Sequence, residues 1–314
     1  LLCMQNSLLS QKAKQSGSRL IEINSQFAVF HYLLFNANKY DVIHVQNSKA
    51  LIWVVLSKWF YKTPVVYTRR VDFVPKGILT LWKYKQLDKV VAISEAIQNI
   101  LINQGMPDIE VIPSMVKERK LNKVNAENTL QQLGLTGKKL IATTAAFVPH
   151  KDPDTLVKAI AELKKLRTDF VFLHFGEGEL MHEIKTEVQK LNLQQEFIFM
   201  SFRDDAEDFF SVMDVFVMSS QEEGLGSSVL DAFLYGVPVA STDAGGLKET
   251  IEGCGLLSAV KDYKALAANI NELLNDTEFK KALTEKAKQR VAEKYSVQKN
   301  TEKYLTLFHQ LTSS

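Results

Sequence analysis

Apolar and polar positions along the chain follow two alternating patterns. Short apolar runs, such as residues 64–68 and 170–175, recur between stretches whose apolar residues lie three and four positions apart, such as 27–36 and 153–166. Continuous apolar runs are typical of strands buried on both faces, and the wider spacing is typical of amphipathic helices. The alternation predicts an α/β fold built from parallel sheets with helices on both faces.

The predicted strands cover residues 19–24, 41–45, 64–68, 89–93, 110–112, 139–144, 170–175, 196–200, 215–218 and 237–241. The predicted helices cover residues 27–36, 48–61, 94–103, 153–166 and most of 263–310. Residues 1–4 are apolar and are expected to be the end of a buried strand that begins before the chain does.

The pattern divides the chain into two parts. A polar segment, residues 117–137, separates them and is the best linker candidate. Because 314 residues exceed what one core usually organises, we expect two doubly wound domains facing each other across a cleft. The predicted divisions are an N-terminal domain at 1–125, a second domain at 126–296, and a helix at 297–314 that packs back on the first domain.

Composition is that of an ordinary soluble protein, with 46% hydrophobic and 24% charged residues. Cys3 and Cys254 are far apart in the chain, which suits a reducing cytoplasm. Residues 1–125 hold 17 basic and 8 acidic side chains, and the remainder holds 21 basic and 28 acidic. This asymmetry favours an anionic partner for the first part, although uneven surface charge without function explains it equally well. Nucleic acid is not expected, because no recognition motif accompanies the basic excess.

The stretch from 219 to 249 is the richest in chemistry. A predicted strand ends near Met218, a loop with Gly224 and Gly226 follows, and a helix begins near Ser227. Glycines let the backbone approach a ligand closely, and the free amides of a helix start, here Ser227 and Ser228, favour an anion such as phosphate.

Two acidic residues flank this helix start. Glu223 precedes the loop and Asp231 lies about one turn into the helix. A carboxylate at the second position suits hydrogen bonding to a sugar diol, since two oxygens accept two hydroxyls. Each acid alone would equally fit an exposed loop position or a helix-dipole partner, but the combination with the glycines and serines points to a ligand.

The stretch resembles the donor-binding signature of retaining GT-B glycosyltransferases of glycosyltransferase family 4, the group 1 transferases. Those enzymes read E-G-F-G-x-x-x-x-E, then a small-G-x-P-V strand and a G-G-x-x-E turn. The matching segments here are 223–226, 236–239 and 245–249. Asp231 stands where the family has Glu and is one methylene shorter. The resemblance implies a GT-B fold, Glu223 holding hydroxyls of the transferred sugar, and the amides of Ser228 and Val229 meeting the donor diphosphate.

The resemblance extends over nearly the whole chain. Residues 174–180 resemble a turn near the nucleotide, and residues 199–204 resemble a segment whose backbone faces the base. Lys151 matches the lysine of a strand-to-helix turn and would neutralise the diphosphate. The implied donor-binding residues are Gly176, Glu177, Gly178, Phe202, Arg203, Gly224, Leu225, Gly226, Ser227, Ser228, Val229 and Asp231.

One departure concerns the cation that stabilises the leaving diphosphate. The family usually has Arg five residues before that Lys, where this chain has Ala146. We expect Arg70, or its neighbour Arg69, to project across the cleft and replace the lost charge. The implied catalytic residues are therefore Glu223, Lys151 and Arg70. His44 and Arg69 are expected on the acceptor side, although a lone His at a strand end is as often structural.

The resemblance implies transfer of a sugar from a nucleotide diphosphate sugar to an acceptor hydroxyl, with retention, in cell-surface polysaccharide or glycolipid synthesis. No metal site and no cofactor are expected, because no His or Asp cluster with ligand spacing is visible. Relatives open with a strand and a Gly-Gly loop that this chain lacks, so we expect it to be missing one βα unit.

The expected partners are the nucleotide sugar, a glycan or lipid-linked acceptor, and an anionic membrane. Residues 57–62 and 79–85 mix aromatic and basic side chains, which suits peripheral contact with the inner face of the plasma membrane. A buried helix face with exposed lysines accounts for these stretches as well. Two alternative functions stay open: a non-catalytic nucleotide-sugar-binding protein, and a GT-B epimerase or phosphorylase.

Overall fold

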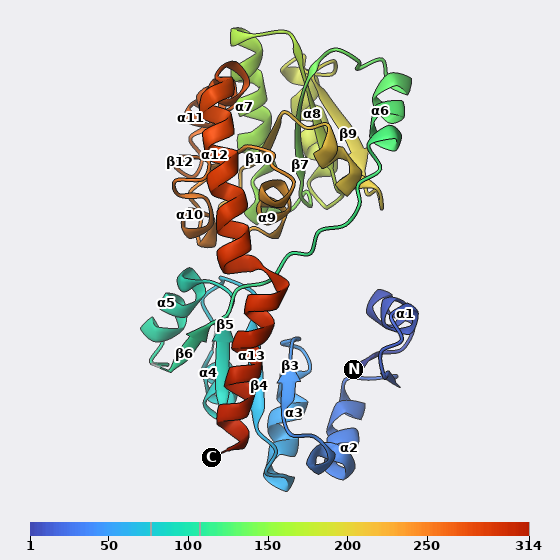
Figure 1. Ribbon diagram of the computed structural model, residues 1–314, viewed down its shortest axis with the longest axis vertical. Helices are drawn as coiled ribbons and strands as arrows, with labels where there is room; N and C mark the ends of the chain where they lie inside the picture. Colours follow the sequence, from blue (N-terminus) through green and yellow to red (C-terminus); the bar gives the residue numbers. More distant parts are fainter. Residues whose placement is uncertain (76, 107, 314) are drawn as a thin grey trace.

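The computed structural model describes residues 1–75, 77–106 and 108–313, and it forms two α/β lobes (Figure 1). The N-terminal lobe has a four-stranded parallel sheet of order β3-β4-β5-β6 and a separate two-stranded parallel sheet, β1-β2. Its strands are β1 (Leu2–Met4), β2 (Ile21–Ile23), β3 (Ile43–Val45), β4 (Val65–Arg69), β5 (Lys89–Ala92) and β6 (Ile109–Val111). Its helices are α1 (Leu8–Gln15), α2 (Phe27–Asn36), α3 (Leu51–Ser57), α4 (Ile78–Lys85) and α5 (Glu95–Asn103).

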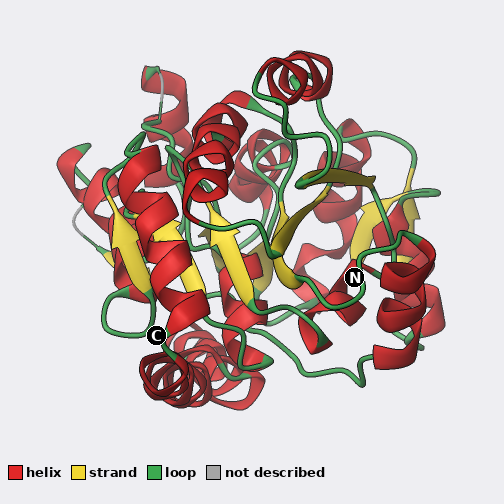
Figure 2. Cartoon of the chain, turned by 90° about the horizontal axis from the view of Figure 1, so that it is seen from above, coloured by secondary structure: helices red, strands yellow, loops and turns green. Residues whose placement is uncertain are grey.

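The C-terminal lobe has a six-stranded parallel sheet of order β12-β11-β10-β7-β8-β9. Its strands are β7 (Lys139–Thr144), β8 (Phe170–Phe175), β9 (Phe197–Ser201), β10 (Val215–Met218), β11 (Val239–Thr242) and β12 (Leu256–Ser258). Its helices are α6 (Lys123–Gln132), α7 (Pro153–Leu166), α8 (Met181–Lys190), α9 (Ser227–Leu234), α10 (Gly246–Ile251), α11 (Tyr263–Asn275) and α12 (Thr277–Arg290). Seen from above, the strands lie between layers of helices (Figure 2). The predicted α/β class with parallel sheets is confirmed.

The strand order explains where a ligand would bind in the C-terminal lobe. The chain enters this sheet at β7 and proceeds through β8 and β9 to one edge, then returns to build β10, β11 and β12 on the other side. The order therefore reverses between β7 and β10. Crevices of doubly wound sheets open at the carboxyl ends of the strands at such a switch point.

Two local predictions need correction. The predicted linker 117–137 contains the ordered helix α6, and its Ala126 is fully buried in the core of the C-terminal lobe. Asn122 starts this helix by accepting the amide of Asn125, a capping interaction that the polar composition obscures. The apolar residues at the start of the chain form β1, which pairs with β2 only and carries a single buried side chain, Cys3.

The last helix, α13 (Val297–Thr312), returns to the N-terminal lobe (Figure 1). Its Leu307 is buried in a cluster with Val66, Val91 and Ile112. Between α12 and α13 the chain passes from one lobe to the other through a π-helical turn, residues 291–295. The chain also crosses between the lobes near Val116, and the Val116 amide donates to the Tyr295 carbonyl at 3.1 Å. The two crossings thus form a common hinge region between the lobes.

The lobes also meet through a second contact that involves α9. Leu225 and Leu230 of the C-terminal lobe are buried in the same apolar cluster as Ile97 and Leu101 of α5. Burial of these side chains holds the start of α9 against the N-terminal lobe.

Candidate active site

Two loops at the switch point carry the predicted catalytic residues. The turn after β7 ends in a 3-10 segment, Pro149–Lys151, and the loop after β10 leads into α9. The amides of Gln221 and Glu222 donate to the His150 carbonyl at 2.8 and 3.3 Å, and the Ser219 hydroxyl donates to the Lys151 carbonyl at 3.0 Å. These bonds fix one loop against the other.

The structure brings Lys151 and Glu223 together as an ion pair. Their side chains are 21% and 15% exposed, so the pair is largely shielded from water. Removing either side chain would leave the other charge shielded from water and uncompensated, which is costly. The site therefore holds a lysine ammonium whose present counter-ion is a carboxylate of the neighbouring loop.

The glycines of the signature allow three backbone segments to meet. A Cβ on Gly246 would lie 2.2 Å from the Gly224 carbonyl oxygen, and one on Gly245 would lie 2.5 Å from the Glu223 carbonyl oxygen. A Cβ on Gly224 would lie 2.9 Å from the carbonyl oxygen of Arg70 in the N-terminal lobe. These positions exclude any side chain, so the glycines serve loop-to-loop and lobe-to-lobe packing.

The first turn of α9 has backbone amides without acceptors. Gly226 takes a left-handed conformation at φ +85° and offers no side chain to cap the helix. The Val229 amide donates to the Gly226 carbonyl at 2.9 Å, and the Ser228 hydroxyl donates to the Thr144 carbonyl at 3.2 Å. Among the described residues, the amides of Ser227 and Ser228 have no acceptor. The Val229 amide is used within the first turn in this structure, and its expected contact with a diphosphate stays a prediction.

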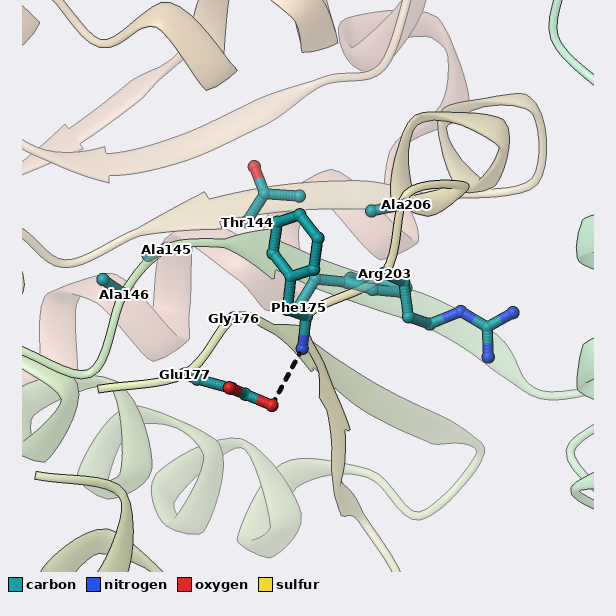
Figure 3. A pocket seen from close by; sticks show the side chains of 9 residues that line it. Thr144, Ala145, Ala146, Phe175, Gly176, Glu177, Arg203 and Ala206 are labelled. Carbon is teal, nitrogen blue, oxygen red and sulfur yellow. Dashed lines mark hydrogen bonds between the residues drawn. The ribbon is translucent and has the colours of Figure 1, made fainter. Parts of the chain in front are cut away.

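A pocket of about 440 Å³ lies beside this helix start (Figure 3). It is lined by Thr144, Ala145, Ala146, Phe175, Gly176, Glu177, Phe202, Arg203 and Ala206. Thr144 is also the residue that Ser228 contacts, so the pocket and the free amides adjoin. Four predicted donor-binding residues, Gly176, Glu177, Phe202 and Arg203, are among those that line it.

Side chains around this pocket are fixed in different ways. Glu177 accepts a long hydrogen bond of 3.5 Å from the Phe202 amide, whereas the Arg203 guanidinium points away from Glu177 (Figure 3). Arg203 is paired with Asp205, and this guanidinium lowers the pKa of Asp205 to about 2. Gly178 does not line the pocket; its Cβ would lie 2.4 Å from the Phe147 carbonyl oxygen, so it shapes the turn instead.

Asp231 lies in the second turn of α9 and is a partly buried carboxylate without a hydrogen bond to any described residue. Burial raises its pKa to about 6, Glu207 contributes in the same direction, and Arg119 opposes both. Its oxygens are therefore able to accept hydrogen bonds from a ligand.

The two arginines after β4 are held differently. The Arg70 guanidinium is exposed and donates to Gln46 and Ser114, both neutral, at 2.8 Å each. Arg69 is only 4% exposed and donates to the Tyr84 hydroxyl at 2.6 Å and to the Phe73 carbonyl. Sequence reasoning identified the arginines but missed Gln46, Ser114 and Tyr84, which orient them, because neutral polar residues carry no motif.

His44 lies beneath α13. Its Nε2 is 2.8 Å from the Thr68 hydroxyl, and its ring packs on Tyr304 and Phe308 with centroid distances of 5.0 and 5.5 Å. Burial, with help from the charge of Arg70, lowers the pKa of His44 to about 4, so the ring is neutral at physiological pH. These contacts place it against the last helix and outside the pocket described above.

The residues that the structure describes hold neither a cluster of metal ligands nor a helix that could span a membrane. Within residues 1–75, 77–106 and 108–313, no group of three or more His, Cys, Asp or Glu side chains could hold a metal ion. Over the same residues, no helix combines the length and the apolar character that crossing a bilayer requires.

Comparison with known proteins identifies relatives of both lobes. The family model for group 1 glycosyl transferases matches residues 125–290, and the model for Glycosyltransferase Family 4 matches residues 16–119. The N-acetyl-alpha-D-glucosaminyl L-malate synthase of Bacillus anthracis is 25% identical over 232 residues, covering 72% of this chain and 61% of the relative. The chain thus spans about three-fifths of the length of that relative.

Two further relatives cover more of the chain. The UDP-Gal:alpha-D-GlcNAc-diphosphoundecaprenol alpha-1,3-galactosyltransferase of Escherichia coli is 25% identical over 302 residues, covering 88% of this chain and 77% of the relative. The crystal structure of Anabaena Alr3699/HepE in complex with UDP and glucose superposes with a TM-score of 0.87 at 20% identity, covering 98% of this chain and 91% of that one. The architecture is therefore GT-B, as predicted. Since the group 1 model spans more than half of its length, the chain belongs to the family of group 1 glycosyl transferases.

Proposed function

We propose that this chain transfers a sugar from a nucleotide diphosphate sugar to an acceptor hydroxyl, retaining the anomeric configuration and using no metal ion. The observation that carries the proposal is the group of anion-binding elements at the switch point. Lys151 lies on the turn after β7, the free amides of Ser227 and Ser228 lie at the start of α9, and the pocket beside them has the volume of a nucleoside fragment.

In this proposal each part of the donor meets one element. The base enters the pocket lined by Phe202 and Glu177, and the ribose hydroxyls donate to the unpaired carboxylate of Asp231. The diphosphate lies against the start of α9, where the amides and the helix dipole favour negative charge. The sugar then extends toward Glu223.

The ion pair between Lys151 and Glu223 gives donor binding a chemical consequence. A diphosphate at the start of α9 competes for the Lys151 ammonium, which is a point charge suited to phosphate. The carboxylate of Glu223 is then available to accept sugar hydroxyls. Before the donor arrives, the pair keeps both charges compensated in a shielded site.

The reaction breaks the bond between the anomeric carbon and the phosphate oxygen, and the bonding electrons leave with the diphosphate. A bond forms between the anomeric carbon and the acceptor oxygen, and the acceptor proton is released. Charge develops on the leaving diphosphate in the transition state, so preorganised cations and amides lower the barrier. We assign this role to Lys151, the α9 amides and Arg70.

Arg70 is the cation that we propose in place of the arginine absent at Ala146. Its guanidinium is exposed and bonded only to neutral partners, Gln46 and Ser114, so its charge is not compensated. Its carbonyl oxygen lies against Gly224, which brings this part of the N-terminal lobe next to the donor loop. Arg69 is less suited, because its terminal nitrogens are engaged by Tyr84 and Phe73.

For the acceptor we propose a glycan or lipid-linked saccharide, in synthesis of cell-surface polysaccharide or glycolipid. The Escherichia coli relative is named for an acceptor carried on diphosphoundecaprenol. Large apolar side chains of the N-terminal lobe, including Trp59, Phe60, Ile78 and Leu79, are between 62% and 88% exposed. Together with the basic excess of this lobe, they support cytoplasmic action at the inner face of an anionic membrane.

Turnover of nucleotide sugars by the purified chain tests the proposal. We expect Lys151→Ala to lower kcat/KM for the accepted donor by about a hundredfold, because it removes a cation from the developing diphosphate charge. Glu223→Gln keeps the shape of the side chain and is expected to lower turnover as well. Lys286→Ala serves as control, since Lys286 is exposed and lies on α12.

The outcomes separate the candidate functions. Unchanged kinetics in both site variants contradict the site assignment. Tight nucleotide binding without release of sugar favours a non-catalytic binding protein. Ala146, which lines the pocket at the position where the family usually has an arginine, fits that function. A new sugar formed without added acceptor indicates an epimerase.

A further inference from the structure

A second pocket lies in the N-terminal lobe, outside the donor site described above. Its volume is about 460 Å³, and it is lined by β4, the start of α3, the helix α4 and the loop 71–75. Cations converge on it from three elements: Lys49 before α3, Arg69 on β4 and Lys83 on α4. No acidic residue lines it among the described residues.

The buried arginine of this pocket lacks an anionic partner. Arg69 is 4% exposed, and its acceptors are the Tyr84 hydroxyl and the Phe73 carbonyl, neither of which carries charge. Its Nε is buried and has no hydrogen-bond partner among the described residues. A buried cation without a counter-ion is costly, so an arginine in this state is typical of a site that receives an anion.

The two lysines at the pocket are also uncompensated. Neither Lys49 nor Lys83 forms an ion pair with a described residue, whereas Lys14, Lys58 and Lys89 of the same lobe are all paired with carboxylates. Uncompensated cations that face one cavity raise the local concentration of anions. The pocket is therefore a place where three cations without a carboxylate partner, Lys49, Arg69 and Lys83, face one cavity.

The loop that walls this pocket also contacts the donor site. The Phe73 ring, which lines the pocket, lies edge-on to His150 with a centroid distance of 5.9 Å, and His150 immediately precedes Lys151. Asp72, in the same loop, lies 3.1 Å from the position of a Cβ on Gly245. An anion in this pocket would thus be separated from the proposed donor by a single loop.

We propose that this pocket binds the phosphate ester of the acceptor, so that the acceptor is a phosphate-bearing molecule. This inference rests on the proposed transferase function. A carboxylate is usually bound by the fork of one arginine, but the terminal nitrogens of Arg69 are already engaged. The remaining donors are the unpaired Nε of Arg69 and the ammonium groups of Lys49 and Lys83, which are compact charges that suit phosphate oxygens. Tyr67 and Tyr84 offer aromatic surface for the attached group.

Calorimetric titration of the full chain with glycerol 3-phosphate, in saturating UDP, tests the inference. UDP occupies the donor phosphate site, so the added ester reports on other sites. We expect binding that Lys83→Gln weakens about tenfold, the usual effect of removing one charge-assisted hydrogen bond. Lys85→Gln is the matched control, because Lys85 lies on the same helix, is exposed and does not line the pocket.

A second arm distinguishes a soluble phosphate ester from a lipid phosphate. Phosphatidylcholine vesicles with and without phosphatidic acid are sedimented with the same variants. Glycerol 3-phosphate binding that depends on Lys83 supports a soluble ester, and vesicle retention that depends on Lys83 supports a lipid phosphate. Equal behaviour of Lys83→Gln and Lys85→Gln in both arms overturns the inference. If the unaltered chain does not bind UDP, the proposed function is overturned instead.

Discussion

Single residues of the donor site differ in how their charges are balanced. Lys151 is paired with Glu223 and Arg203 with Asp205, so these groups need a competing ligand before they act. Asp231 has no such partner, and its pKa is raised to about 6 by burial. The ionisation state of Asp231 therefore changes between pH 5 and 7.

Nucleotide-sugar affinity is predicted to rise as the pH rises from 5 to 7. In the proposed function the ionised Asp231 accepts ribose hydroxyls. With a pKa of about 6, only about a tenth of it is ionised at pH 5, which predicts up to about tenfold weaker binding there. Calorimetry at pH 5, 6 and 7 checks this. Asp231→Asn should remove the dependence and Asp154→Asn, an exposed residue of α7, should keep it; a dependence that survives Asp231→Asn contradicts the assigned role.

The same shift affects stability, and its sign is opposite to that of most carboxylates. The pKa of Asp231 is higher in the folded chain than its usual value of 3.8, so the folded state holds a proton that the unfolded state has lost between about pH 4 and 6. The contribution of Asp231 to the free energy of unfolding therefore falls as the pH rises through this window. The ionisation of Asp231, which is predicted to favour nucleotide binding, therefore lowers the free energy of unfolding.

At the scale of elements, the loops before α9 and α10 pack on each other and on the N-terminal lobe. Glu249 of α10 accepts the amides of Glu95 and Ala96 at 3.1 and 3.3 Å, so a residue of one lobe caps helix α5 of the other. Arg290 of α12 donates to the Thr250 carbonyl at 2.9 Å and fixes α10 from behind. The donor loop is therefore supported by elements of both lobes.

Glu249→Ala is predicted to destabilise the contact between the lobes. It leaves two first-turn amides of α5 without their acceptor, a loss that typically costs about 1 kcal/mol. Urea unfolding measures the change, and Glu252→Ala is the control because Glu252 is exposed at the end of the same helix. Equal unfolding midpoints for both variants would show that the cap contributes nothing.

Sequence patterns predicted elements better than they predicted contacts. Residues 139–144, 153–166 and 170–175 were predicted with the bounds that the structure shows, because continuous burial or a single apolar face leaves a clear period. Helix α6 was missed because its few buried residues, such as Ala126, lie in a polar segment. Strand β12, Leu256–Ser258, was also missed.

The sequence motifs predicted which residues belong to the candidate site, but not how those residues contact one another. The signature located Lys151 and Glu223, but no sequence period encodes their pairing, which depends on loops far apart in the chain. The position of His44 beneath α13 likewise arises from tertiary packing. The roles of these residues in catalysis stay predictions.

At the scale of the whole molecule, three structures besides the Glu249 cap link the lobes over long distances in the chain. These are the crossing at Val116 and Tyr295, the apolar cluster shared by Leu225 and Ile97, and α13, whose Tyr304 hydroxyl lies 2.9 Å from that of Thr68. If the proposed roles hold, donor and acceptor are bound by different lobes that share a boundary.

A crystal structure of the chain with a bound nucleotide sugar tests the central claim most directly. The account predicts diphosphate oxygens within hydrogen-bonding distance of the Ser227 and Ser228 amides and near Lys151, with the base in the pocket between Thr144 and Arg203. A diphosphate bound in the pocket of the N-terminal lobe, or an α9 start that remains without ligand at saturating nucleotide, would contradict it.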